Sequence, residues 1–375
     1  MDEIRDSRAG HTRRNMKGAA AFNSFVPTPL QDIEIEWTDD LAQELAETEA
    51  ALAKLAAAFA ALAPEQQAEL VEAALRAEAE SSWKLTEGRD LGPRFDGSRG
   101  ASFKSSIATD IALGSDASGQ VAPDEGAQAN RETDAASATS QAGSASEYLS
   151  LICLPSEDGD ALSADAPELE PIELQEIDDL AAALRYALDP FDDLPVSRRL
   201  LENAHYLMTQ SPRYEKLYPG EFRRSPNWIA GPKATLATAR YVPPADEDMT
   251  DAFSALEHFI HEASDLPELV RIALTHYQFE AIHPFLDGNG RIGRILTLVM
   301  LRDAGLISAP ILPLSDVLRE RAVTYYGSID FVEHEGEYET WVKFFLLVLR
   351  EAAERALEIS ETRERLKAAE RSTAH

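Results

Sequence analysis

The sequence contains a single cysteine, Cys153, among its 375 residues. One cysteine cannot form a disulfide within the chain, and it cannot build a thiolate metal site by itself. The eight histidines show no ligand-like cluster of the kind found in helical zinc motifs. Disulfide frameworks and cysteine- or histidine-based metal centres are therefore not expected within this chain.

Long apolar runs are also missing. Although 44% of the residues are hydrophobic, no uninterrupted run is long enough to cross a bilayer. Residues 1–18 carry acidic side chains and lack the apolar stretch of a secretory signal. We therefore expect a soluble, cytoplasmic protein.

Basic residues are in marked deficit. Lysine and arginine number 35 against 66 aspartates and glutamates, a formal net charge of −31. A chain of this charge repels nucleic-acid backbones and anionic lipid surfaces, so neither is an expected partner. Any phosphate ligand has to be held by a local concentration of hydrogen-bond donors.

Composition divides the chain into five parts. We expect a disordered N-terminus at 1–24, an N-terminal helical region at 25–88 and the main helical domain at 172–356. The stretch 89–171 is rich in small and polar residues, which bury too little apolar surface to offset the cost of ordering, and we interpret it as a linker or insertion. Residues 357–375 are predicted to form a charged C-terminal helix or tail.

Helical patterning dominates outside the linker. Apolar residues three and four apart recur after Thr38, a candidate N-cap, and through most of the main domain. Proline, glycine and β-branched residues between Pro219 and Pro244 instead indicate a loop with a short hairpin, around residues 235–242. The expected fold is mostly α, with a helical core, one short β-hairpin and an N-terminal helical region.

One segment concentrates chemically useful side chains: HPFLDGNGRIGR, from His283 to Arg294. Pro284 should end the preceding helix at His283. The Gly-Asn-Gly run that follows tolerates backbone conformations in which successive N–H groups point into a concavity, directly before a new helix. Helix N-termini favour anions, so the loop is predicted to hold phosphates.

Other side chains of this segment supply complementary functions. Arg291 and Arg294 lie three apart in the first turn of the new helix and can face one anion. Asp287 is suited to Mg²⁺ shared with a polyphosphate, and His283 to removing a proton from a hydroxyl. Taken singly, each element is more often an ordinary helix end or helix start. Their combination within one short segment favours a phosphate site.

This segment resembles the signature HPFx[D/E]GNGRxxR of Fic domains and matches it at every specified position. The resemblance extends to PGEFR, NWI, ARYVPP and LTHYQFEAIHPF, and it covers about residues 180–356. It implies a Fic-type helical core in which the hairpin forms a flap that aligns a target segment. Residues 25–88 resemble, more loosely, the N-terminal helical region that is attached to some Fic enzymes.

The resemblance implies a protein adenylyltransferase, which moves AMP from ATP to a Tyr, Ser or Thr hydroxyl of a target protein or of itself, with Mg²⁺ or Mn²⁺ as cofactor. It assigns His283 as the base and Asp287 as the metal ligand. The residues assigned to ATP are Gly288, Asn289, Gly290, Arg291, Ile292, Gly293 and Arg294, with Tyr325 or Tyr326 lining the nucleotide pocket.

Three further points follow from the resemblance. Removal of AMP, transfer of another phosphate-linked group, or a non-catalytic regulatory module remain alternatives on the same fold, and a homo-oligomer is compatible with it. Some relatives carry an inhibitory helix with the pattern [S/T]xxxE[G/N], which ESSWKLTEG resembles with shifted spacing. Glu87 is accordingly expected to pair with Arg294 and restrain the enzyme.

Overall fold

The structure is a computed structural model of the whole chain. The residues that it describes are 6–17, 20–87, 169–189, 195–229, 235–237 and 239–373. Except for residues 169–171, the predicted linker at 89–171 lies outside them, so nothing is concluded about its structure.

The described part of the chain is mostly helical, as predicted. Its helices are α1 (Asp39–Ala60), α2 (Pro64–Glu87), α5 (Pro171–Ala187), α6 (Arg198–Met208), α7 (Asp246–His261), α8 (Glu268–Ile282), α9 (Asn289–Asp303), α10 (Leu314–Glu320), α11 (Ala322–Glu335) and α12 (Tyr338–Thr373), with short 3₁₀ turns at Leu30–Asp32 (η1) and Pro212–Tyr214 (η2). None of the described helices is both long and apolar enough to span a membrane.

The expectation of disorder at residues 1–24 is wrong for the described part of that segment. Strands β1 (Asp6–Ser7), β2 (Gly10–Lys17) and β3 (Ala20–Pro27) form a three-stranded antiparallel sheet in that order. Phe22 and Phe25 of β3 are buried, and the Phe25 amide donates to the Val242 carbonyl at 2.8 Å. Long-range docking orders this polar segment, and local composition could not reveal it.

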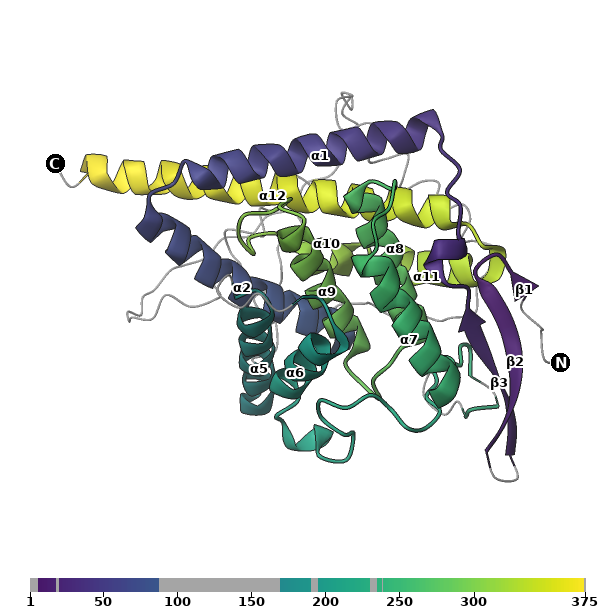
Figure 1. The fold of residues 1–375 in the computed structure, drawn as a ribbon. Helices are drawn as coiled ribbons and strands as arrows, with labels where there is room; N and C mark the ends of the chain where they lie inside the picture. Colours follow the sequence, from purple (N-terminus) through teal and green to yellow (C-terminus); the bar gives the residue numbers. More distant parts are fainter. Residues whose placement is uncertain are drawn as a thin grey trace, which may run out of the picture.

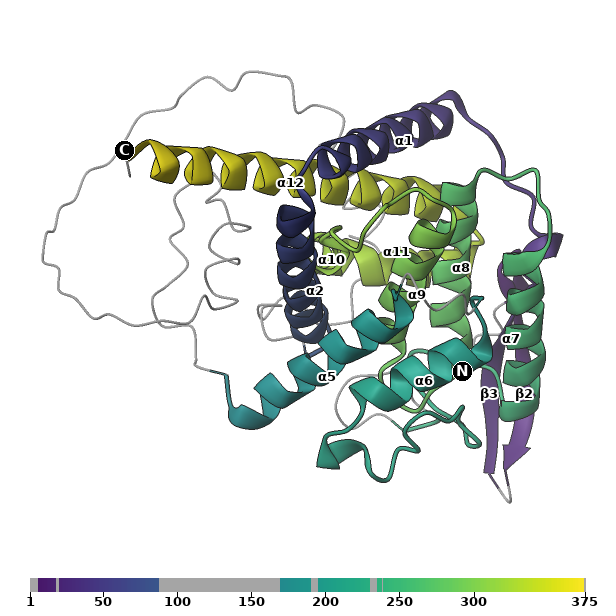
Figure 2. The same ribbon diagram turned by 60° about the vertical axis from the view of Figure 1, so that its left-hand side comes forward.

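Helices α1 and α12 lie side by side along one edge of the molecule (Figures 1 and 2). Thr38 caps α1 as predicted, its hydroxyl accepting from the Leu41 amide at 3.2 Å. The Thr48 hydroxyl donates to the carbonyl of Leu346 on α12 at 3.1 Å. Helix α12 runs unbroken through the expected boundary at 356–357, so the charged C-terminal segment continues a core helix.

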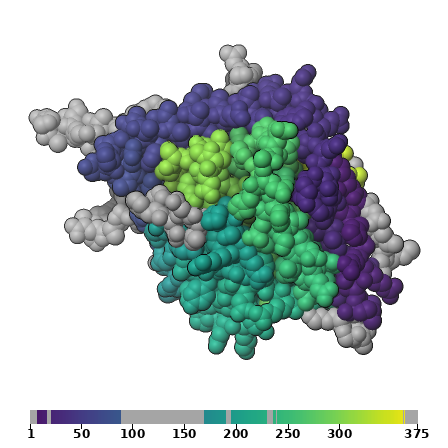
Figure 3. Space-filling view, viewed as in Figure 1, coloured from purple at the N-terminus to yellow at the C-terminus, as the bar shows by residue number. Residues whose placement is uncertain are grey.

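Helix α2 packs against α5, α9 and α10. The Trp83 indole donates to Glu176 on α5 at 3.0 Å, and buried Glu78 accepts from the backbone amide of Ser315 on α10 at 3.0 Å. Residues of α1 and α2 belong to the same hydrophobic core as α8, α9 and α12. The N-terminal region is therefore part of one core, and in Figure 3 its purple surface borders the green surface of the main domain.

The predicted hairpin at 235–242 is reduced, in the described part of its loop, to one antiparallel bridge between Ile229 and Tyr241. Each residue's amide donates to the other's carbonyl, at 2.9 and 3.2 Å. The Tyr241 hydroxyl donates to the carbonyl of Ala281 on α8 at 2.6 Å. The bridge is thus fixed beside the C-terminal end of α8.

Candidate active site

The loop between α8 and α9 carries the His283–Arg294 segment. Helix α8 ends at Ile282, and His283 follows in the left-handed conformation with φ 51°. Positive φ is uncommon for a residue with a side chain and is held here by its surroundings. The His283 amide donates to the Phe279 carbonyl at 3.0 Å, and the His283 carbonyl accepts from the Arg223 side chain at 2.8 Å.

The orientation of the His283 ring determines which of its nitrogens carries the proton. Its Nδ1 lies 3.2 Å from the Glu280 carbonyl, which can only accept, so Nδ1 carries the proton and Nε2 keeps a lone pair. Burial and then the nearby Arg223 charge lower the pKa of His283 to about 4. The ring is therefore neutral at physiological pH, as a general base requires.

Asn289 holds the loop in shape. Its side chain is buried and bonds the Phe285 backbone twice, accepting from the amide at 2.8 Å and donating to the carbonyl at 2.9 Å. Gly288, at φ 83°, precedes the helix and accommodates a conformation that side chains rarely adopt. The Asn289 side chain is therefore committed to the loop, and only its backbone is available to a ligand.

The backbone N–H groups at the start of α9 are available for an anion. The first N–H groups of an α-helix have no partner within the helix, and in α9 these belong to Asn289, Gly290 and Arg291. Ile292 was expected among the nucleotide contacts, but its amide bonds the Gly288 carbonyl at 3.1 Å and its side chain is fully buried. Fewer residues of the segment are therefore open to a ligand than the sequence suggested.

Arg291 and Asp287 lie close to each other at the start of α9. The Arg291 side chain is 1% exposed, and its three nitrogens have no hydrogen-bond partner among the described residues. It lies over the Tyr214 ring at 5.5 Å and 3.7 Å from an Asp287 carboxylate oxygen. A buried cation with so few partners strengthens the positive field at this turn, while Asp287 stays at the rim.

The Arg294 side chain points toward helix α2, away from Arg291. Its Nε donates to the Ser82 hydroxyl at 2.8 Å, and one terminal nitrogen donates to the Ser82 carbonyl and the Thr86 hydroxyl, each at 2.9 Å. The side chain is buried, with 2% exposure. The two motif arginines therefore occupy different surroundings, one on the Asp287 side and one on the α2 side.

The predicted pair between Glu87 and Arg294 is wrong. Glu87 bonds Arg213 at 2.8 Å, and the α2 residues that hold Arg294 are Ser82 and Thr86. Residues four apart lie on one face of a helix, whereas Glu87 is rotated about 100° from Thr86. The shifted spacing in the sequence thus places a neutral hydroxyl where the carboxylate was expected.

The two tyrosines predicted for the nucleotide pocket differ in their surroundings. Tyr325 is 1% exposed and bonds the buried His276 at 2.8 Å, so its side chain belongs to the core. His276 in turn contacts the Thr297 hydroxyl at 2.8 Å. Tyr326 lines the cavity beside the His283 loop. Of the two, Tyr326 is the one that lines this cavity.

Two positioning residues were not predicted as parts of the site. Arg223 is buried and donates to the carbonyls of His283, Ile282 and Pro244 at 2.8, 3.2 and 2.7 Å. His205 accepts from the Gly220 amide at 2.9 Å, so its other ring nitrogen donates to the Asp287 carbonyl at 3.0 Å. Nothing in the local sequence marks His205, because its partners come from distant segments.

A cavity of about 640 Å³ lies beside the His283 loop. Its walls come from the loop (His283, Asp287, Gly290), from α2 (Thr86) and from α11 (Tyr326), and the Ile229–Tyr241 bridge lies at its rim. It is large enough for a nucleotide. The cavity brings the His283 ring, the start of α9 and the Asp287 carboxylate to one place.

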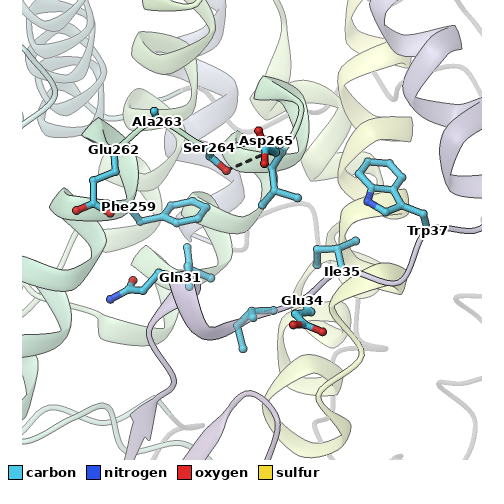
Figure 4. Close-up of a pocket in the computed structure, with 12 residues that line it drawn as sticks. Gln31, Glu34, Ile35, Trp37, Phe259, Glu262, Ala263, Ser264 and Asp265 are labelled. Atoms are coloured by element: carbon cyan, nitrogen blue, oxygen red, sulfur yellow. Dashed lines mark hydrogen bonds between the residues drawn. The ribbon is translucent and has the colours of Figure 1, made fainter.

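One further cavity lies outside this arrangement, whereas a group of side chains on α11 borders it, since Asp330 and Glu333 also line the first cavity. A second cavity lies between the segment from Leu30 to Trp37 and the end of α7, away from the motif (Figure 4). In the described ranges, three side chains of α11 could share a metal: Asp330, Glu333 and His334. Because Asp330 already pairs with Arg240 at 3.0 Å, we assign no metal there.

Known proteins resemble this chain in sequence over part of its length. The Fic/DOC family matches residues 195–301. The chain is 31% identical over 127 residues to "Protein adenylyltransferase Fic" of Drosophila virilis, covering 33% of this chain and 23% of that protein. It is 31% identical over 142 residues to the protein of that name from Culex quinquefasciatus, covering 37% and 24%. It thus spans about a quarter of these relatives.

Two solved structures share the fold. A Fic family protein from Desulfovibrio desulfuricans G20 has a TM-score of 0.52 at 19% identity, covering 86% of this chain and 75% of that one. A Fic domain containing signaling protein from Bacteroides thetaiotaomicron has a TM-score of 0.50 at 14% identity, covering 86% and 97%. At these identities the likeness concerns the fold alone.

Proposed function

Because this chain is a Fic domain protein, we propose that it is a protein adenylyltransferase that transfers AMP from ATP to a hydroxyl side chain of a target protein. The observation that carries the proposal is that His283 and the first residues of α9, Asn289 and Gly290, line one cavity. The name of the curated relatives supports the same reaction.

In the proposed reaction, Nε2 of His283 takes the proton of the target hydroxyl as that oxygen attacks the α-phosphorus of ATP. The bond to the leaving pyrophosphate breaks as the new bond forms, and AMP stays on the target. Backbone N–H groups of Asn289, Gly290 and Arg291 orient the phosphates and oppose their charge. Transfers of this type depend mainly on positioning and charge neutralisation.

Asp287 fits a divalent cation by its chemistry. Its side chain is 42% exposed at the cavity rim, and a carboxylate is a preferred ligand of Mg²⁺ shared with phosphate oxygens. When bound, Mg²⁺ or Mn²⁺ would neutralise charge on the polyphosphate. We propose Asp287 as its protein ligand.

Incubation of the purified chain and candidate targets with ATP labelled on the α-phosphorus tests the proposal. Label retained on protein after denaturation supports AMP transfer. Release of label from pre-modified protein, without incorporation, would support removal of AMP instead. Neither incorporation nor release would support a non-catalytic module.

Asp287→Asn should weaken nucleotide binding only when Mg²⁺ is present. The amide oxygen can still accept from the Gly288 amide, which Asp287 Oδ1 now does at 2.6 Å, but the charge that attracts the cation is lost. Interactions with a charged group contribute roughly 1.5–3 kcal/mol, so a loss of about tenfold or more in affinity is expected. Calorimetry with and without Mg²⁺ measures it, and an equal loss in both conditions would contradict the assignment.

Joint replacement Ser82→Ala and Thr86→Val should raise nucleotide affinity and self-labelling. It removes two hydroxyls that hold Arg294 against α2, so the guanidinium can turn to the outer phosphates at lower cost. Because hydrogen bonds to charged groups contribute roughly 1.5–3 kcal/mol, a rise of about tenfold is expected. Nucleotide titration and α-phosphate labelling provide the measurement.

Glu87→Gly is the matched comparison on the same helix. It removes the bond to Arg213 and leaves all three bonds of Arg294 to α2 intact. We expect nucleotide affinity and labelling to stay at the parental level. A clear rise with Glu87→Gly and none with the double variant would reverse the roles assigned to these residues.

A further inference from the structure

Glu280 is an acidic side chain inside the anion site. It lies in the last turn of α8, one turn before His283, and lines the same cavity as Gly290 and Tyr326. Neither the phosphate-binding loop nor the proposed mechanism uses it. Its place in the cavity therefore needs a separate explanation.

The Glu280 carboxyl reaches across to the first turn of α9. A methyl group added at Gly293 would lie 2.5 Å from its Oε1, and one added at Gly290 would lie 3.9 Å away. The absence of a side chain at position 293 is what makes room for the carboxyl. Oε1 is buried and has no hydrogen-bond partner among the described residues.

A buried oxygen without a partner is costly, so its place beside an anion site calls for a ligand. An ionised carboxylate there would repel bound phosphates, whereas a protonated carboxyl can donate a hydrogen bond to a phosphate oxygen. We propose that Glu280 binds the polyphosphate of the nucleotide as a neutral carboxylic acid, taking up a proton as the nucleotide binds. This inference rests on the proposed function, because it concerns the same nucleotide.

The surroundings of Glu280 support this protonation. Burial raises the pKa of Glu280 to about 7, against the opposing effect of the nearby Arg294 charge. On α11, burial raises the pKa values of Tyr325 and Tyr326, so both stay neutral. His283 is also neutral, because its pKa is lowered to about 4.

One other group near Arg294 titrates in the same range. Burial raises the pKa of Glu78 on α2 to about 7, but its carboxylate bonds the Ser315 amide at 3.0 Å and does not line the cavity. Glu78→Gln is therefore the matched control for Glu280→Gln. The other charged side chains that line the cavity, Asp287, Arg240, Asp330 and Glu333, are present in every variant and contribute equally to all of them.

The sign of the pH effect follows from linkage. Bound phosphate stabilises the protonated form and so raises the pKa of Glu280 above its value in the free protein. The contribution of Glu280 to nucleotide affinity is complete below the pKa that Glu280 has in the free protein. It is lost as pH rises through the pKa that Glu280 has in the complex. Affinity for the nucleotide should fall by on the order of tenfold between pH 6.5 and 8.5.

The test is calorimetry with an ATP analogue that carries a methylene bridge between its α and β phosphorus atoms. Titrations at pH 6.5 and 8.5, in buffers of different ionisation heat, give both affinity and proton uptake. We expect the parent and Glu78→Gln to take up a proton at pH 8.5, where free Glu280 is ionised because its pKa is about 7, and to bind more weakly there than at pH 6.5. Glu280→Gln, which keeps a donor without titrating, should bind with neither proton uptake nor that added pH slope.

Gly293→Ala provides a second variant, because its methyl group forces the carboxyl to move. It should bind more weakly at pH 6.5 and show the same loss of pH slope as Glu280→Gln. Unfolding curves check that each variant is folded. The titration of the analogue itself is common to all variants and cancels in the comparison.

Other outcomes would overturn the inference. Glu280→Gln with the full parental pH slope would show that another group titrates. A loss in Glu280→Gln that occurs only with Mg²⁺ would make Glu280 a metal ligand instead. A parent that binds without proton uptake sinks this inference alone, whereas a parent that does not bind the analogue sinks the proposed function as well.

Discussion

His283→Ala is expected to reduce AMP transfer by roughly 10²–10⁴-fold, the usual contribution of a general base, while nucleotide binding is retained. The ring presents its unprotonated Nε2 because Nδ1 is committed to the Glu280 carbonyl at 3.2 Å. The N–H groups that we propose as phosphate ligands belong to the first turn of α9 and do not depend on this side chain. Initial rates of labelling from α-labelled ATP, together with calorimetric affinity, separate the two quantities.

His258→Ala is the matched control for this loss. His258 is a histidine of α7 whose side chain is 73% exposed, and its one ion-pair contact is to Glu262 at 3.6 Å. It should label at the parental rate. If His283→Ala also labels at a near-normal rate, proton removal by this ring is not part of the reaction.

Arg223→Met is expected to destabilise the protein and to lower transfer at the same time. The buried guanidinium donates to the carbonyls of His283, Ile282 and Pro244, and its removal leaves these acceptors unpaired at the end of α8. Each unsatisfied buried group costs about 1–3 kcal/mol, so a loss of about 3 kcal/mol in the free energy of unfolding is expected. Methionine fills most of the volume, so the loss reflects hydrogen bonds more than a cavity.

Transfer should fall further than the unfolded fraction explains, because the left-handed conformation of His283 loses its main restraint. Denaturant unfolding gives the stability, and labelling at low temperature, where the variant remains folded, gives the activity. Arg224→Met is the adjacent control, since that side chain is 84% exposed and pairs with Glu221. Equal effects of the two substitutions would mean that the charge of this segment matters and the bracing of the loop does not.

The sequence predicted the parts of the site that local chemistry determines. Pro284 ends α8 at the expected residue, and Gly288 takes the positive φ that the Gly-Asn-Gly run suggested. The mostly helical fold followed from apolar spacing in the same way. These features depend on neighbours within a few residues, which one sequence displays directly.

Long-range partners could not be predicted in this way. Arg294 bonds residues 212 and 208 positions away, and only the packed arrangement of α2 decides that Ser82 and Thr86 reach it while Glu87 does not. The inward turn of the Asn289 side chain likewise depends on the shape of the loop. The docking of β3 at Val242 joins segments from opposite parts of the chain, so composition alone suggested disorder.

The bonds between Arg294 and α2 have a consequence for motion in a helix that lies far from the motif in the sequence. Two groups that compete for one guanidinium are thermodynamically coupled, and the coupling is reciprocal. If nucleotide draws Arg294 away, the last turns of α2 lose three hydrogen bonds, and their backbone amides should exchange with solvent faster. Conversely, a partner that bound and ordered this end of α2 would lower the affinity for nucleotide without entering the cavity. Under the proposed function, the order of the last turns of α2 and the occupancy of the nucleotide site are therefore two sides of one equilibrium.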